Sequence, residues 1–290
     1  MAIPTVWQIL PRVRMKDRRR LTGQVVLITG ASSGIGMAAA KAFAQEGGSL
    51  MLAARRLDRL KDLAAKLQGT GARCGFMETD VQNYEQVHRL VEETVQQYGR
   101  IDVLINNAGM GLLGLFHSQS WEGVSRVLRT NLEGALAMCH AVIPQLIRQR
   151  SGVIVNVSSV VGKRSTPRLA AYCASKFGLW GFSEALGLEL QPLGIHVCHF
   201  CPTKTATEFQ EKAGITQIHR RRLGLDSPDR VARAMVDAVV SRRREHIMSV
   251  TERVLIKSHL IAPAFTDRLL RLVRRDQEPI AHTGRQERRE

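Results

Sequence analysis

The chain of 290 residues has few cysteines, few aromatic residues and no apolar run long enough to cross a membrane. Its five cysteines are scattered, which argues against a disulfide framework and suits a reducing, cytoplasmic location. Aromatic residues make up 5% of the chain and form no interleaved platform, so no nucleic-acid partner is expected despite a net charge of +16. The longest apolar candidate, residues 2–10, is far shorter than the roughly 20 residues of a spanning helix. Basic residues follow this stretch instead of preceding it, unlike in a signal peptide.

The sequence Cys198-His-Phe-Cys201 has the spacing of a redox motif. Redox motifs of this type open a helix, whereas this one closes an expected strand just before Pro202. We therefore expect both thiols to pack in the core, and no metal site is predicted.

Apolar runs of strand length alternate with helix-forming stretches along most of the chain. With 44% hydrophobic residues the chain can bury a full core. The alternation predicts an α/β fold in which helices cover both faces of a parallel sheet, as one domain with two tails. Strands are expected at residues 25–29, 49–53, 73–78, 102–105, 152–157, 195–200 and 247–250, and helices at 35–46, 57–67, 84–98, within 120–150, at 171–191 and at 228–241.

A glycine-rich loop, Gly30-Ala-Ser-Ser-Gly34-Ile-Gly36, follows the first expected strand and opens the first helix. Without side chains the backbone can turn sharply and approach a pyrophosphate at the positive N-terminal end of that helix. A tight turn without a ligand is the alternative. The order of strand, loop and helix favours a dinucleotide site.

Tyr172 and Lys176 lie four residues apart in the helix expected at 171–191, so both side chains project from one face. A neighbouring ammonium favours phenolate and lowers the pKa of a tyrosine, which suits the pair to exchange a proton with a substrate oxygen. The spacing alone arises by chance in about one chain in ten, so the pair depends on its context for support.

Taken in this order, the two motifs resemble the short-chain dehydrogenase/reductase family. Further matches are Asn106-Asn-Ala-Gly109 after an apolar run, Asn131 in a helix, and Ser159, thirteen residues before Tyr172. The resemblance implies a single doubly wound Rossmann domain with a seven-stranded, mostly parallel sheet and helices on both faces. The expected divisions are a basic N-terminal tail at 1–21, an NADP-binding catalytic domain at 22–250 and a basic amphipathic extension at 251–290.

The resemblance also implies hydride transfer between a nicotinamide cofactor and a carbonyl or alcohol. Tyr172 would serve as general acid and base, while Ser159 would hydrogen-bond the carbonyl oxygen and orient it. Lys176 would hold the nicotinamide ribose and lower the pKa of the tyrosine, and Asn131 would hold a water that links Lys176 to solvent. The structural alternatives are a turn residue for Ser159 and a helix-interior or cap residue for Asn131.

The sequence after the second expected strand favours NADP(H) over NAD(H). A cofactor without the 2′-phosphate is normally held here by an acidic residue, but Ala54 stands at this position and Arg55 follows it. The Arg55 guanidinium can grip a phosphate through a fork of donors, with help from Arg56 or a serine. The alternative is that both arginines are solvated surface charges. The other expected cofactor-binding residues are Gly30, Ser32, Ser33, Gly34, Ile35, Gly36, Asp80, Val81, Asn107, Ala108, Gly109, Tyr172, Lys176, Pro202 and Thr207.

One departure from the family lies in Pro202-Thr-Lys-Thr-Ala-Thr207, where Thr203 replaces a glycine. A backbone that needs positive φ at Thr203 would be strained, which would disturb the expected contact of Thr207 with the nicotinamide amide. Asp80 also has an alternative interpretation, because an Asp at a strand end commonly caps a helix.

The substrate pocket is expected to be lined by residues 110–116, 160–169 and about 203–225. Their apolar members indicate a lipophilic ketone or aldehyde: Met110, Leu112, Leu113, Leu115, Phe116, Val160, Val161 and Phe209. Four basic residues could instead form a rim for an anionic acyl carrier, as in a 3-oxoacyl carrier-protein-type reductase, although an ordinary solvated surface is preferred: Lys163, Arg164, Arg168 and Lys204. A noncatalytic NADP-binding regulator is a further alternative.

Two features bear on partners. The helix at 171–191 is apolar nearly all round, so it is expected to be covered by the sheet and, by the resemblance, in a homodimer or homotetramer. Both tails are basic, and residues 264–275 have the pattern of a basic amphipathic helix. That helix could lie on an anionic membrane surface as a peripheral contact, although docking on the domain or a second subunit is preferred.

Overall fold

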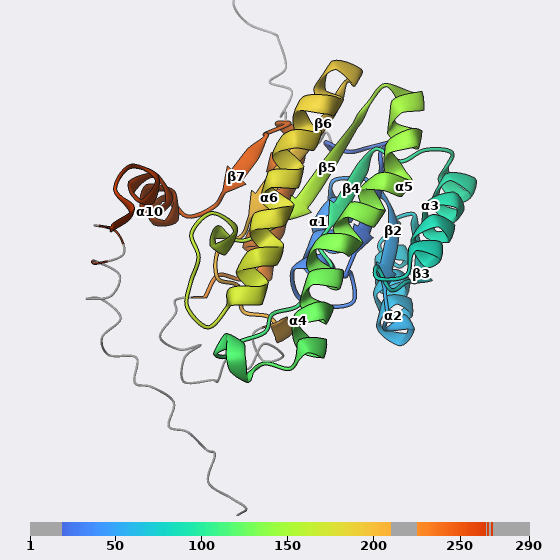
Figure 1. Ribbon diagram of the computed structural model, residues 1–290. Coiled ribbons are helices and arrows are strands. Elements are labelled where there is room, and N and C mark those ends of the chain that lie inside the picture. Colours follow the sequence, from blue (N-terminus) through green and yellow to red (C-terminus); the bar gives the residue numbers. More distant parts are fainter. Residues whose placement is uncertain (1–18, 210–224, 265, 267, 269–290) are drawn as a thin grey trace, which may run out of the picture.

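The computed structural model describes residues 19–209, 225–264, 266 and 268. Seven strands form one sheet in the order β3-β2-β1-β4-β5-β6-β7 (Figure 1). Every neighbouring pair is parallel, which confirms the predicted α/β fold and makes the sheet parallel throughout instead of mostly parallel. The strands are β1 (Val25–Thr29), β2 (Ser49–Ala54), β3 (Cys74–Glu78), β4 (Val103–Asn106), β5 (Gly152–Val157), β6 (Ile195–Cys201) and β7 (Glu245–Ile247).

The central strands β1, β4 and β5 are buried along their whole length. Strands covered on both faces need apolar side chains in both directions, which explains the continuous apolar runs in the sequence. Strand order reverses between β1 and β4, so the loops that leave these two strands diverge. A crevice at such a switch point, beyond the carboxyl ends of the strands, is where open α/β sheets bind ligands.

Two layers of helices cover the sheet (Figure 1). One layer packs its apolar side chains, among them Phe43, Leu60 and Met235, into a single core cluster with one face of the sheet. The other layer buries Leu90 and Met138 against the opposite face. The first layer consists of α1 (Gly34–Gln45), α2 (Leu57–Gln68) and α9 (Pro228–Val240), and the second of α3 (Tyr84–Tyr98), α5 (Gly134–Gln149) and α6 (Ala170–Leu190).

The helix expected within residues 120–150 is interrupted near its middle. It consists of α4 (Trp121–Leu128), a π-helical turn η2 (Arg129–Glu133) and α5. At the start of α5, a Cβ on Gly134 would lie 2.7 Å from Val81 Cγ2, so the glycine allows a close approach to the chain after β3. π-Turns within α-helices often occur at functional sites, and this one carries Asn131.

The predicted seventh strand at residues 247–250 is wrong in its position. β7 ends at Ile247, and Val250 begins α10 (Val250–Ile261), a helix that the sequence interpretation missed. The Ser249 hydroxyl caps α10 by accepting a hydrogen bond from the Glu252 backbone N–H at 3.2 Å. A serine followed three residues later by glutamate is a helix-start signature, and here it outweighs the β preference of valine.

The first described residues pack on the domain. Leu21, which the prediction assigns to the N-terminal tail, is 1% exposed and belongs to the core. Arg20 pairs with Glu46 at 2.5 Å and with Asp237 at 2.7 Å. The predicted amphipathic helix at 264–275 lies almost entirely outside the described residues. Among the helices that the structure describes, none combines the length and the apolar character that a membrane span requires.

All five cysteines are buried and unpaired. Cys198 and Cys201 both lie in β6, and Cys201 packs with Ile247 and with Ile256 of α10. The predicted packing role of this pair is therefore confirmed.

Candidate active site

The glycine-rich loop leads from the carboxyl end of β1 into α1. Gly30 and Gly34 have φ angles of +66° and +55°, in the left-handed region that favours glycine. A Cβ on Gly36 would lie 2.3 Å from the Gly30 carbonyl oxygen, so the loop folds back on itself where no side chain fits. Ser33 stands at the N-cap position without a capping side-chain hydrogen bond, and Ile35 packs on the core. The positive end of α1 is thus suited to hold an anion.

Hydrogen bonds from the chain after β4 fix this loop. Asn107 Nδ2 donates to the carbonyl oxygens of Thr29 at 3.0 Å and of Gly30 at 3.2 Å. The Thr29 hydroxyl accepts from the backbone N–H groups of Asn107 and Ala108 at 3.0 and 3.1 Å. The Asn107 side chain therefore positions the loop. Sequence reasoning missed Thr29, whose one signal is a hydroxyl at the end of an apolar strand.

Next to the loop lies a group of donors that we call the arginine cradle, formed by Ser32, Ser33, Arg56 and Arg59. Arg56 Nη2 donates to Ser33 Oγ at 2.7 Å and to Ser32 Oγ at 3.1 Å. Arg56 and Arg59 each pair with one carboxylate oxygen of Glu208. Three of the predicted cofactor residues thus meet here.

Arg55, which the sequence interpretation ranked ahead of Arg56, lies apart from the cradle. Its side chain is 65% exposed, and its Nη1 is 3.9 Å from Asp80 Oδ2. The local sequence could not rank two adjacent arginines, because which of them turns toward the loop depends on how the chain leaves β2 and enters α2.

The residues after β3 and β4 lie at the same edge of the sheet. Asp80 Oδ1 accepts a hydrogen bond from the Gln82 backbone N–H at 3.0 Å, as in a turn-capping Asp. Val81 is buried and packs against the start of α5. Gly109 lies close to Asn131, since a Cβ there would be 3.2 Å from its Oδ1.

Ser159 follows β5, and Tyr172 and Lys176 stand one turn apart in α6. The Lys176 Nζ lies 5.7 Å from the centroid of the Tyr172 ring. It also donates to the carbonyl oxygen of Val157 at 2.8 Å, which ties α6 to the strand that leads to Ser159. A Cβ on Gly162 would lie 2.7 Å from the Lys176 carbonyl oxygen, so this glycine lets the turn after Ser159 approach α6 closely.

Burial controls the protonation of both α6 side chains. It raises the pKa of Tyr172 above the ordinary value, and the nearby Ser159 hydroxyl partly offsets this effect. Burial lowers the pKa of Lys176 to about 8. The expected lowering of the tyrosine pKa is therefore wrong, because burial, which disfavours the charged phenolate, is the largest influence on this phenol. The phenol keeps its proton across the neutral range and is suited to donate it.

The Asn131 side chain forms hydrogen bonds with the backbone of Met110 beside the site. Its Oδ1 accepts from the Met110 N–H at 2.8 Å, and its Nδ2 donates to the Met110 carbonyl oxygen at 2.8 Å and to Ser175 Oγ at 3.1 Å. Asn131 is 1% exposed. These contacts agree with the helix-interior alternative and give Asn131 a positioning role, while the expected water bridge to Lys176 stays a prediction.

The backbone after β6 runs without the strain expected at Thr203. Among the described residues other than glycine, only Arg150, Arg168 and Arg242 have positive φ. The Thr203 hydroxyl donates to Asp226 Oδ2 at 2.5 Å. Thr203 thus supplies a hydrogen bond that the expected glycine would lack.

Residues 207–209 lie beside the glycine-rich loop, the arginine cradle and Tyr172. A Cβ on Gly34 would lie 3.1 Å from Thr207 Cβ, so Thr207 packs against the glycine-rich loop. The Phe209 ring lies 5.7 Å from the Tyr172 ring, centroid to centroid, at an interplanar angle of 55°. Pro202, directly after β6, is partly buried. Sequence reasoning missed Glu208 altogether, since no local pattern marks a glutamate that meets arginines about 150 residues away.

Only some of the residues expected to line the substrate pocket lie near Tyr172. Met110 and Leu112 pack in one apolar cluster with Tyr172. Leu115 and Phe116 are exposed. Val160 packs instead against the cluster under α10. Most of the third expected segment, residues 210–224, lies outside the described residues.

Lys163 does not belong to an open basic rim. Its Nζ lies 4.4 Å from the centroid of the Trp180 ring and pairs with Glu245, and its side chain is only 13% exposed. Lys163 therefore connects η3 (Val160–Gly162) to α6 and β7.

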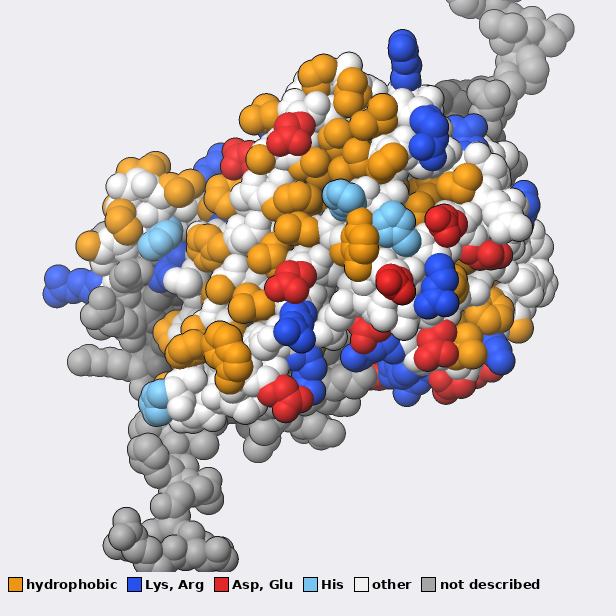
Figure 2. All heavy atoms as spheres, turned by 45° about the vertical axis from the view of Figure 1, so that its right-hand side comes forward, with side chains coloured by type: hydrophobic (Ala, Val, Ile, Leu, Met, Phe, Trp, Pro, Cys, Tyr) orange, Lys and Arg blue, Asp and Glu red, His pale blue; other side chains and the backbone are white. Residues whose placement is uncertain are grey.

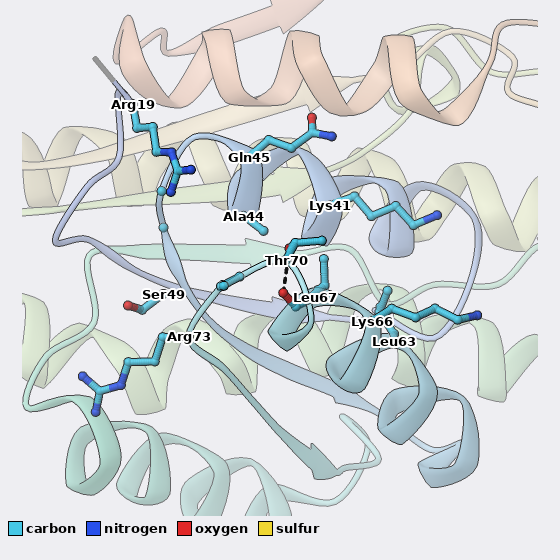
Figure 3. A pocket seen from close by; sticks show the side chains of 14 residues that line it. Arg19, Lys41, Ala44, Gln45, Ser49, Leu63, Lys66, Leu67, Thr70 and Arg73 are labelled. Carbon is cyan, nitrogen blue, oxygen red and sulfur yellow. Dashed lines mark hydrogen bonds between the residues drawn. The ribbon is translucent and has the colours of Figure 1, made fainter. Parts of the chain in front are cut away.

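A separate hollow lies between the ends of α1 and α2, beside the start of β2 (Figure 3). Its basic side chains are Arg19, Lys41, Lys66 and Arg73, and Figure 3 shows Arg73 on the opposite side of the hollow from Lys41 and Lys66. No predicted site residue lines it. This hollow is at the amino edge of the sheet, opposite the crevice.

Taken together, the fold and the site define an α/β protein with a glycine-rich loop, a partly buried tyrosine and a buried lysine at the carboxyl edge of its sheet. The chain matches the family described as short chain dehydrogenase over residues 24–217, and it belongs to that family. It is therefore an oxidoreductase of a family that binds a nicotinamide cofactor.

Individual relatives agree with this assignment. The 3-oxoacyl-(acyl-carrier-protein) reductase of Thermotoga maritima is 38% identical over 75% of this chain and 90% of its own length. A structure of an actinorhodin polyketide ketoreductase variant with NADPH has a TM-score of 0.70 at 31% identity, covering 76% of this chain and 92% of that one. A short chain dehydrogenase/reductase from Burkholderia phymatum in complex with NAD has a TM-score of 0.78 at 25% identity, covering 90% and 99%.

Proposed function

We propose that this protein is an NADP-dependent oxidoreductase that interconverts a carbonyl and an alcohol. The observation that carries the proposal is the meeting of Ser159, Tyr172 and Lys176 beside a glycine-rich loop with an arginine cradle. A proton donor, a phosphate-binding loop and a set of phosphate donors in one crevice fit this chemistry better than any of them alone.

In the proposed mechanism, NADPH held in the site would supply the hydride for the carbonyl carbon. Tyr172 gives its proton to the carbonyl oxygen, and its raised pKa supports this role because the phenol stays protonated near pH 7. Ser159 donates a hydrogen bond to the same oxygen and orients it. Lys176 holds the nicotinamide ribose, and Asn131 positions the backbone of Met110 beside the reacting centre.

The residues of the crevice fit NADP(H) better than NAD(H). The glycine-rich loop would hold the pyrophosphate at the start of α1. Arg56, with Ser32 and Ser33, would hold the 2′-phosphate, because guanidinium and hydroxyl groups all offer donors to it. The rest of the cofactor would be contacted by residues that follow β3, β4 and β6, namely Asp80, Val81, Asn107, Ala108, Gly109, Pro202 and Thr207.

The substrate in this proposal is a lipophilic ketone or aldehyde. Support comes from Met110 and Leu112, which pack with Tyr172, and from Phe209, whose ring lies against the same tyrosine. Apolar walls around a few polar groups are typical of small-molecule sites.

A 3-oxoacyl carrier-protein-type reductase is the second candidate. The Thermotoga maritima relative carries that name and is 38% identical to this chain. The engagement of Lys163 with Glu245 and Trp180 removes one member of the basic rim that would receive an acidic carrier, and so weighs against it.

We also propose that the protein forms a homodimer or homotetramer in the cytoplasm. Figure 2 shows hydrophobic side chains gathered on the surface of the α3, α5 and α6 layer. Ile147 of α5 and Phe177 and Leu188 of α6 are exposed there, at 40%, 39% and 58%. Apolar surface of this kind is typical of an interaction face. Peripheral membrane contact through the basic tails stays a prediction.

A steady-state assay tests the proposal. NADPH and NADH are compared side by side against a panel of lipophilic ketones, aldehydes, acyl-carrier thioesters and polar sugars. We expect turnover of a lipophilic carbonyl with a clear preference for NADPH. Absence of turnover across the panel, with NADPH bound, would favour a noncatalytic NADP-binding regulator instead.

A further inference from the structure

Three consecutive residues after β6 touch three functional parts of the crevice. Thr207 packs against the glycine-rich loop, Glu208 pairs with Arg56 and Arg59, and Phe209 lies against Tyr172. We call residues 207–209 the strap. One short segment thus contacts the phosphate loop, the arginine cradle and the tyrosine at the same time.

The Glu208 carboxylate lies among groups that suit a phosphate. One of its oxygens is 3.0 Å from Arg56 Nη1, and the other meets Arg59 Nη1. Arg56 in turn donates to the hydroxyls of Ser32 and Ser33. The charged side chains are partly exposed, at 31% for Arg56 and 35% for Glu208, so water and ions can exchange with this contact.

A carboxylate and a phosphate group seek the same donors. Both are anions that accept forked hydrogen bonds from a guanidinium. Two anions cannot share the donors of Arg56 without repelling each other, so binding of one disfavours the other. The Glu208 contact is therefore a competitor for any phosphate that uses the cradle.

We propose that Glu208 is an internal anion that competes with the 2′-phosphate of the cofactor for Arg56 and Arg59. The inference rests on the proposed function. A cofactor that carries the 2′-phosphate replaces the Glu208 carboxylate, and the strap leaves the cradle. Since Phe209 is the next residue, the same movement shifts the ring that lies against Tyr172.

This competition makes Glu208 a specificity-determining residue. A cofactor without the 2′-phosphate offers nothing to replace the carboxylate, so it must bind with the strap in place or leave two guanidinium groups without an anion. Recognition of the phosphate is thereby linked to the uncovering of the tyrosine.

Binding of cofactor fragments tests the inference without reference to turnover. Isothermal titration calorimetry compares adenosine 2′,5′-bisphosphate with adenosine 5′-monophosphate on the wild type and on Glu208→Gln. We expect the substitution to tighten binding of the bisphosphate about fivefold, because the competing state is weakened. Binding of the monophosphate should change less than about twofold.

Glu122→Gln is the matched control, since it also neutralises a glutamate that pairs with an arginine. Glu122 Oε1 lies 3.7 Å from Arg126 Nη1 in α4. This control substitution should leave the affinity for both cofactor fragments unchanged. Equal or weaker bisphosphate binding by Glu208→Gln would overturn the inference. If the wild type fails to bind the bisphosphate at all, the proposed NADP dependence itself fails, which separates the two ideas.

A double-mutant cycle tests the link to the tyrosine. Phe209→Ala alone should also tighten bisphosphate binding, since it loosens the strap. In the Glu208→Gln background it should add little, because the strap is already released. Fully additive effects would show that the two residues act separately and would contradict a strap that moves as one unit.

Discussion

The two walls of the crevice are held together by different forces. The glycine-rich loop is fixed by close backbone contacts and by the hydrogen bonds of Thr29 and Asn107. The chain after β6 is held by charged side chains, through Thr203 with Asp226 and Glu208 with the arginine cradle. One wall is built from packing and backbone geometry, and the other from polar contacts near solvent.

This difference explains how one site can be both preorganised and responsive. Close-packed backbone has one arrangement, so the loop that receives the pyrophosphate is ready before any ligand arrives. Partly exposed ion pairs are weaker and are screened by salt, so the opposite wall can change partners at little cost. The rigid wall then sets where a cofactor binds, and the polar wall sets which cofactor is preferred.

Gly36→Ala is expected to have the largest effect on the rigid wall. The new Cβ would lie 2.3 Å from the Gly30 carbonyl oxygen, which forces the loop backbone to move. We expect a loss of about 3 kcal/mol or more in the free energy of unfolding and no measurable NADPH binding. Urea unfolding and calorimetry measure both.

Gly181→Ala is the control for this change, since a Cβ on this exposed helical glycine meets nothing within 4 Å. It should raise stability by up to about 1 kcal/mol because alanine favours the helix. Normal NADPH binding by Gly36→Ala would mean that the loop is not the rigid wall described above.

Arg56→Gln is expected to have the next largest effect. Arg56 lies between the two walls, because it contacts Ser32 and Ser33 of the loop and Glu208 of the chain after β6. Loss of a charged donor to the 2′-phosphate should weaken NADPH binding by about tenfold to a hundredfold and leave NADH binding nearly unchanged. Arg55→Gln, at an exposed position beside Asp80, should weaken NADPH binding by less than about threefold. The reverse ranking of the two variants would return the phosphate-binding role to Arg55.

Much of the rigid wall could be predicted from the sequence. β1 and its loop are specified locally, by an apolar run and by glycines whose spacing fits one turn. The polar wall depends on residues far apart in the chain, and neither Glu208 nor Asp226 carries a local signal. The sequence also does not show how deeply Tyr172 is buried. The four-residue spacing of Tyr172 and Lys176 therefore led to the wrong direction for the tyrosine pKa.

β7 and α10 show a different reason for failure. A three-residue strand has too little pattern to be located from apolar residues alone, and its pairing with β6 is a tertiary contact. The capping pair Ser249 and Glu252 was a local signal for α10 that the strand interpretation overlooked.

Asp226→Asn should have the smallest effect, confined to the polar wall. The Thr203 hydroxyl and then Arg230 hold the pKa of Asp226 below its ordinary value of 3.8. A lowered pKa in the folded state means stability that is present above pH 4 and is lost as pH falls through the lowered pKa. We expect the wild type to exceed Asp226→Asn by about 1 kcal/mol at pH 6 and by less at pH 3.

Urea midpoints at the two pH values measure this difference, and exposed Asp62→Asn serves as the control. A difference between the wild type and Asp226→Asn that grows as the pH falls would have the wrong sign for an ionised Asp226 in the folded state.

The central claim is that Tyr172 donates the proton in an NADPH-linked carbonyl reduction. The most direct measurement is single-turnover oxidation of NADPH by the wild type and by Tyr172→Phe with a carbonyl that the wild type reduces. Phenylalanine keeps the ring that packs against Phe209 and removes only the hydroxyl. We predict a rate loss of about a hundredfold or more with unchanged NADPH affinity. An undiminished rate in Tyr172→Phe would contradict the account.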